Sequence, residues 1–172
     1  FYRLQQEWVN SAYRNFNDFD TYLILMYLMN KVYINYSDRF HYMSMEAFYS
    51  QDKVGIEKIN LIEISKDLNI PKETVRRKIN YLQANEIIIR SGKSIFLHSK
   101  GLGIQKPMST IENMSSLLSK LSIYLSAEDW FGKALEKEDI KKFITEHFTV
   151  SWEYWYRLSL IHISEPTRLT CI

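Results

Sequence analysis

Hydrophobic residues in the middle of the chain follow the spacing of a short amphipathic helix. Leu61, Ile64 and Leu68 recur at intervals of three and four residues, which places them on one face of a helix. Asn60 and Glu63 have the spacing of a capping box, in which the Asn60 side chain accepts a hydrogen bond from the Glu63 amide. The pattern therefore predicts a helix that begins just after residue 60.

A second helix is predicted over residues 72–84, directly after Pro71. Its hydrophobic residues Val75, Ile79 and Leu82 share one face, which suits it for packing against the first helix. The polar residues on or near the opposite face are Lys72, Glu73, Arg76 and Arg77. Together the two helices have the layout of a helix-turn-helix.

Two short runs rich in β-forming residues follow, over residues 87–90 and 93–97. The turn dipeptide Ser91-Gly92 separates them, as in a β-hairpin. We therefore expect a hairpin wing directly after the second helix.

The residues before this unit are aromatic and mostly helical in pattern. We expect a helix over residues 22–33, capped by Asn17 or Asp18, and then a shorter helix through residues 45–48. Residues 51–55 are polar and are expected to form a connection.

Helical patterns also follow the wing. Ser109 and Glu112 again have capping-box spacing, and further helices are expected over residues 127–135 and 139–147. We expect the aromatic residues between 130 and 156 to pack against the N-terminal aromatic residues rather than to line an effector pocket. The first of these helices has a hydrophobic seam of Ile111, Met114, Leu118, Leu121 and Leu125. The seam suits either the interior of the chain or an oligomer interface.

The predicted fold class is mainly α with a small β-hairpin wing: a winged helix-turn-helix flanked by N- and C-terminal helices. The expected segments are an N-terminal helical segment over residues 1–56, the winged helix-turn-helix over 57–106 and C-terminal helices over 107–157. At 172 residues, length alone favours a single compact unit.

Positive charge is concentrated in the winged segment. Residues 57–106 contain ten basic and five acidic residues, whereas the whole chain has a net charge of only +2. Local charge of this kind is the electrostatic footprint of nucleic-acid binding.

The turn between the two predicted helices has the residues that a helix-turn-helix needs. Ser65 is small enough for a close approach of the helices, Asn69 tolerates a positive φ, and Val75 is an apolar residue on the second helix. Residues 64–77 resemble the helix pair of cyclic-AMP-receptor-type regulators, and residues 82–97 resemble their short wing.

This resemblance implies that the second helix lies in the major groove and that Lys72, Glu73 and Arg77 reach base edges. The sequence departs from the family in three respects. Lys72 stands where arginine is usual, Pro71 replaces a serine or threonine cap, and the preceding residues do not resemble a cyclic-nucleotide-binding barrel. The helices on both sides of the winged unit resemble instead the arrangement of MarR-type regulators, which implies a homodimer formed through the terminal helices.

The chemistry of each side chain suggests whether it contacts a base or a phosphate. Arg77 can pair with guanine through O6 and N7, whereas Glu73 can accept from cytosine N4 or pair with Arg77 one turn away. Lys72 lacks the fork of arginine, so its contact should discriminate less. The residues expected at the phosphate backbone are Thr74, Arg76, Lys78, Lys93 and Ser94.

Other chemistry has little support in the sequence. His41, His98 and His147 lack metal-ligand spacing and no nucleophile motif is present, so we expect no enzyme activity, no metal and no cofactor. The longest apolar run, residues 22–29, is too short to span a membrane. With one cysteine, a reducing cytoplasmic location is expected.

The C-terminal residues have a separate explanation. Residues 158–168 resemble the translation of a transposon-end sequencing adapter, so we set residues 158–172 aside as an artefact and expect a fragment of a longer gene.

The sequence thus predicts sequence-specific binding of double-stranded DNA by a transcriptional regulator whose operator and effector it does not identify. The alternative is a winged-helix protein-interaction module without DNA binding, and RNA binding is a weaker third possibility. Basic residues on the exposed face of the second helix favour DNA.

Overall fold

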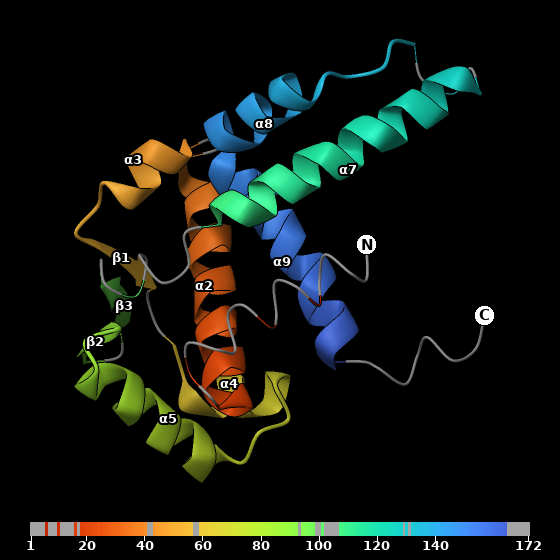
Figure 1. Cartoon of the computed structure of the whole chain (residues 1–172). Coiled ribbons are helices and arrows are strands. Elements are labelled where there is room, and N and C mark those ends of the chain that lie inside the picture. The colour runs from red at the N-terminus through yellow and green to blue at the C-terminus, as the bar shows by residue number, and fades with distance from the viewer. Residues whose placement is uncertain are drawn as a thin grey trace, which may run out of the picture.

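The computed structural model describes residues 6, 10, 16, 18–40, 43–56, 59–92, 94–98, 101, 107–128, 130 and 132–164. It is mainly helical with a small antiparallel sheet, as the sequence predicts (Figure 1). Its elements are α2 (Phe19–Phe40), α3 (Met45–Tyr49), β1 (Lys53–Ile56), α4 (Leu61–Asp67), α5 (Lys72–Ala84), β2 (Ile88–Ser91), β3 (Ser94–His98), α7 (Met108–Ala127), α8 (Lys137–Glu146) and α9 (Phe148–Ser164).

Helix α2 lies at the centre of the molecule and is buried on nearly all sides (Figure 1). It packs against α9 on one side and against α5 and β1 on another. The cap predicted at its start is confirmed, since the Asp18 carboxylate accepts a hydrogen bond from the Thr21 amide at 3.0 Å. Helix α2 therefore joins the winged unit to the C-terminal helices.

Strand β1 corrects the expectation that residues 51–55 form a connection. It pairs antiparallel with β3, so the sheet has the order β1-β3-β2 and the predicted hairpin forms two of its three strands. A Cβ at Gly55 would lie 2.7 Å from Cε1 of Phe96, so a larger residue there would require the Phe96 ring to move. Strand β1 thus belongs to the sheet of the wing although it precedes the expected boundary at residue 57.

The helix predicted to begin just after residue 60 is confirmed, with Asn60 as its N-cap, but neither predicted capping box forms among the described residues. The Asn60 side chain accepts from the Ile62 amide at 2.9 Å rather than from Glu63, whose carboxylate faces α2. Helix α7 begins at Met108 after Pro107, without a side-chain cap. The helix expected over residues 127–135 is also absent from the described part of that range, because α7 ends at Ala127.

An aromatic cluster connects the N-terminal and C-terminal helices. Phe148 at the start of α9 stacks on Trp152 at 5.2 Å and meets Tyr33 of α2 edge to face at 5.7 Å. Phe48 of α3 belongs to the same cluster, and its ring centroid lies 5.6 Å from that of Phe148. The predicted packing of C-terminal against N-terminal aromatic residues is confirmed for these residues.

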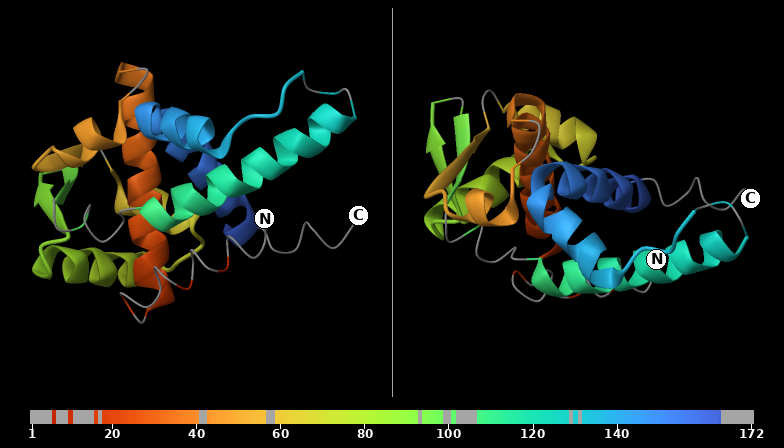
Figure 2. Two further views of the ribbon diagram at one scale, coloured as in Figure 1. Left: turned by 45° about the horizontal axis from the view of Figure 1, so that its top comes forward. Right: turned by 90° about the horizontal axis from the view of Figure 1, so that it is seen from above.

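Helices α7 and α8 form an arm that extends away from the rest of the molecule (Figures 1 and 2). They pack against each other, and Glu112 of α7 holds α8 through ion pairs with Lys137 and Lys141. The arm lies at the opposite end of the molecule from α5.

Candidate nucleic-acid interface

The turn between α4 and α5 is held by hydrogen bonds of Ser65. Its hydroxyl donates to the Ile70 carbonyl at 2.7 Å, and its own carbonyl accepts from the Ile70 amide at 3.1 Å. Asn69 has a φ of 52°, so the predicted positive φ is confirmed. These local contacts set the angle at which α5 leaves the turn.

The inner face of α5 anchors the helix in the core. Val75, Ile79 and Leu82 are fully buried, and α5 packs on α2, α4 and β2. Its C-terminus closes in a Schellman motif, in which Glu86 has a φ of 59° and the Ile87 amide donates to the Leu82 carbonyl at 3.0 Å. The helix is therefore fixed at both ends and along one face.

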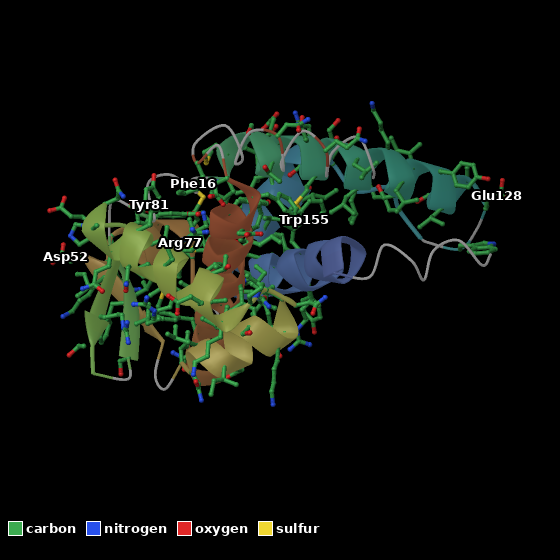
Figure 3. The ribbon with its side chains drawn as sticks, turned by 90° about the horizontal axis from the view of Figure 1, so that it is seen from below. Phe16, Asp52, Arg77, Tyr81, Glu128 and Trp155 are labelled. Carbon is green, nitrogen blue, oxygen red and sulfur yellow. The ribbon has the colours of Figure 1, made fainter. Side chains whose placement is uncertain are left out.

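The outer face of α5 is open to solvent. Lys72, Glu73, Arg76 and Arg77 are all exposed, as predicted from the helical spacing. Figure 3 places Arg77 and Tyr81 together on α5, at the opposite end of the molecule from Glu128 at the end of α7. Within the described part of the chain, Arg77 makes no hydrogen bond or ion pair.

Glu73 pairs with Arg76 and not with Arg77, which corrects one expected contact. The Arg76 Nε donates to both carboxylate oxygens of Glu73, at 3.1 and 3.0 Å, and a further hydrogen bond comes from Nη2. The hydrogen bonds from Arg76 hold the pKa of the Glu73 carboxyl below its ordinary value. Arg77 makes no hydrogen bond with Glu73, although its charge also helps to lower the pKa of that carboxyl.

Lys78 faces inward rather than toward a ligand. Its ammonium group donates to the Asp18 carboxylate at the start of α2, and only 15% of its side chain is exposed. Partial burial raises the pKa of Asp18, but the hydrogen bonds from Lys78 and the Thr21 amide outweigh it, so the pKa lies below its ordinary value. The geometry thus argues against the expected phosphate contact of Lys78.

The remaining predicted backbone contacts lie at the edges of this surface. Thr74 and Ser94 are half-buried, and Ser94 pairs with Ser91 at the tip of the hairpin. This pairing places Ser91 in strand β2 instead of in the predicted turn Ser91-Gly92, and Gly92 has a φ of 59°. Lys93 lies outside the described residues.

The acidic residues of α4 are directed toward α2. The single proton of the Tyr27 hydroxyl is shared between Asp67, at 2.7 Å, and Glu63, at 3.1 Å, and Lys31 pairs with Glu63 at 2.8 Å. Burial and the two carboxylates raise the pKa of the Tyr27 hydroxyl. These contacts hold α4 against α2 and place the negative charge of α4 next to Lys31.

The structure adds exposed residues that the sequence interpretation did not single out. Asn80 and Tyr81 are exposed on α5, and Arg90 is exposed on β2. The helical spacing from Glu73 and Arg77 could have identified Asn80. Nothing in the local sequence distinguishes Arg90 from a solvated strand residue.

The described residues contain no cluster of three or more side chains that could bind a metal ion. No helix in the same part of the chain combines the length and apolar character needed to cross a bilayer. Comparisons with protein-family models, with curated proteins and with solved structures found no match.

Proposed function

We propose that this protein binds double-stranded DNA in a sequence-specific manner and acts as a transcriptional regulator. The observation that carries the proposal is the exposed, unpaired guanidinium of Arg77 on a helix whose other face is fully anchored. A helix about 10–12 Å in diameter fits the major groove, which is about 12 Å wide. Helix α5 is the element proposed to enter it.

Arg77 is the principal base-reading residue in this proposal. An unpaired guanidinium can donate two parallel hydrogen bonds to O6 and N7 of guanine. Lys72, exposed at the start of α5, can approach guanine or a phosphate with a single ammonium group. Glu73 can accept from cytosine N4 only through the oxygen lone pairs that Arg76 leaves available.

The backbone contacts surround α5. Arg76 lies on the flank of the outer face and keeps more than half of its side chain exposed, so it can reach a phosphate while paired with Glu73. Thr74 and the hairpin residues Lys93 and Ser94 are proposed to contact phosphates on either side. Lys78 is left out of this interface because it pairs with Asp18.

The proposal includes a homodimer formed through the arm of α7 and α8. A groove of about 630 Å³ beside these helices is lined mainly by hydrophobic residues, with Ser122, Asp139 and Ser151 as its polar members. The residues of α7 that line this groove are all uncharged, so two copies can meet there with little charge repulsion from α7: Met114, Leu118, Leu121, Ser122 and Leu125.

A dimer joined at the arm suits the reading of duplex DNA. The arm lies at the far end of the molecule from α5, so its pairing leaves both copies of α5 exposed (Figure 1). Two-fold proteins read two half-sites about one helical turn apart. A cytoplasmic location, where such a regulator has access to DNA, is part of the proposal.

A winged-helix protein-interaction module is the second candidate. Surfaces that bind proteins are depleted in lysine and acidic residues at their centre, whereas the outer face of α5 carries Lys72 and Glu73. This composition favours DNA.

Binding to duplex DNA at increasing salt concentration tests the proposal. Each neutralised phosphate should contribute a slope of about −0.9 in log K against log salt. Lys72→Ala should lower affinity, while Lys142→Ala on α8, also an exposed lysine, should leave it unchanged. Absence of salt-dependent binding to duplex DNA would overturn the proposal and favour the protein-interaction module.

A further inference from the structure

Asn80 lies on the outer face of α5. It follows Glu73 and Arg77 at the spacing i, i+4, i+7, so the three side chains project from one side of the helix, away from the buried Val75. The residue is exposed. Within the described part of the chain, its amide makes no hydrogen bond.

No structural role explains an asparagine at this position. It lies inside α5, four residues before the helix ends at Ala84, so it caps neither end. Asparagine is a poorer helix former than alanine, so an exposed asparagine inside a helix does not favour helix formation. An unpaired side-chain amide is therefore available to a ligand on the outer face.

Asparagine has one well-defined partner in the major groove. Its amide can donate to N7 and accept from the N6 amino group of adenine, and no other base offers that pair of groups there. Glu73, on the same strip, is engaged by Arg76. Arg77 and Asn80, by contrast, keep their full hydrogen-bonding capacity on this face among the described residues.

The spacing of these two residues matches neighbouring base pairs. Three residues of α-helix advance by about 4.5 Å, since each contributes about 1.5 Å. Consecutive base pairs are separated by about 3.4 Å. We propose that Asn80 is a specificity-determining residue that reads an adenine next to the guanine read by Arg77, an inference that rests on the proposed DNA binding.

Selection of bound sites from random duplex DNA tests this assignment, with wild type, Asn80→Ala, Arg77→Ala and Gln83→Ala compared at one salt concentration. Gln83 is the matched control because it is another exposed amide on α5 and lies nearer the buried stripe. The wild-type sites should contain adenine next to guanine. Asn80→Ala should lose about tenfold in preference for that adenine and keep the guanine, whereas Arg77→Ala should do the reverse.

Thermal unfolding of each variant separates base reading from folding. Asn80→Ala should unfold at or above the wild-type temperature, because alanine is the better helix former. The assignment is overturned if Asn80→Ala keeps the adenine preference, or if it weakens binding to every sequence equally. Failure of the wild type to bind any duplex would instead remove the proposed function itself.

Discussion

The ammonium group of Lys78 on α5 donates a hydrogen bond to the carboxylate of Asp18, which also caps α2. One side chain thereby ties the start of the central helix to the middle of the helix that carries the exposed cations. The ion pair joins residues 60 positions apart in the chain. It gives Lys78 a structural role on a helix whose other basic residues point outward.

Replacing Lys78 with alanine should affect stability more than DNA binding. The ion pair is half-buried, so its loss should lower the free energy of unfolding by about 1 kcal/mol or less. Urea unfolding measures this change, and titration with duplex DNA measures affinity. If Lys78→Ala lowered the affinity for DNA as much as Lys72→Ala, the result would indicate that Lys78 contacts DNA.

Replacing Arg77 with alanine should relax sequence preference. The cost on a preferred site should be about 1–3 kcal/mol, because a bidentate contact to guanine is lost. Lys93→Ala should instead weaken binding to all sequences alike, as expected for a phosphate contact. Competition between preferred and random duplexes distinguishes the two effects, and equal effects from both variants would contradict this division of roles.

The positive φ of Asn69 predicts opposite results for two small substitutions. Asn69→Ala should destabilise the protein by about 1 kcal/mol, since a Cβ without a compensating side chain is strained at a φ of 52°. Asn69→Gly should be close to neutral, because glycine adopts this region without strain. Equal destabilisation by both variants, measured by denaturant unfolding, would indicate that the asparagine side chain matters and not the backbone conformation.

The ion pairs of Glu112 should give the arm a pH-dependent stability. Hydrogen bonds from Lys137 and Lys141 lower the pKa of Glu112 from 4.5 to about 2. A lowered pKa means that the carboxylate stabilises the folded state above pH 4.5, and that this contribution is lost as the pH falls from 4.5 to about 2.

The variant Glu112→Gln should therefore be less stable than wild type at neutral pH, and the difference should disappear toward pH 2. Thermal unfolding across this range measures it. Glu128→Gln, at the end of α7, forms neither ion pair and should show no such convergence. A constant difference between Glu112→Gln and wild type at every pH would contradict the assignment.

The proposed homodimer through the arm can be tested by substitutions on α7. Leu121 lines the groove beside α7 and α8 and is 47% exposed, so Leu121→Asp should convert a dimer to a monomer. Ile123, 56% exposed on the other face of α7, provides the control, and Ile123→Asp should remain dimeric. Sedimentation velocity measures both, and a monomeric wild type at all concentrations would rule out this interface.

Local sequence determined helix α5 and the turn that precedes it. Pro71 and Asn69 set the boundary between α4 and α5, and the spacing of Val75, Ile79 and Leu82 predicted both the helix 72–84 and its buried face. These features were predictable because they depend on backbone preferences and on residues within one or two turns of each other. The exposure of Arg77 follows from the same spacing.

The formation of strand β1 depends on tertiary structure. Four residues with a glycine among them carry little preference for a strand, and Lys53–Ile56 becomes one only by pairing with β3 about 40 residues later. The ladder supplies hydrogen bonds that the segment cannot make by itself. No pattern within residues 51–55 could have indicated that partner.

Tertiary structure also selected the polar partners. Glu63 accepts hydrogen bonds from Tyr27 and Lys31 instead of closing a capping box, and Lys78 pairs with Asp18. Spacing in the sequence shows which charged groups can meet on one helix, but long side chains reach several acceptors. The acceptor that each one meets depends on which other element the fold brings beside it.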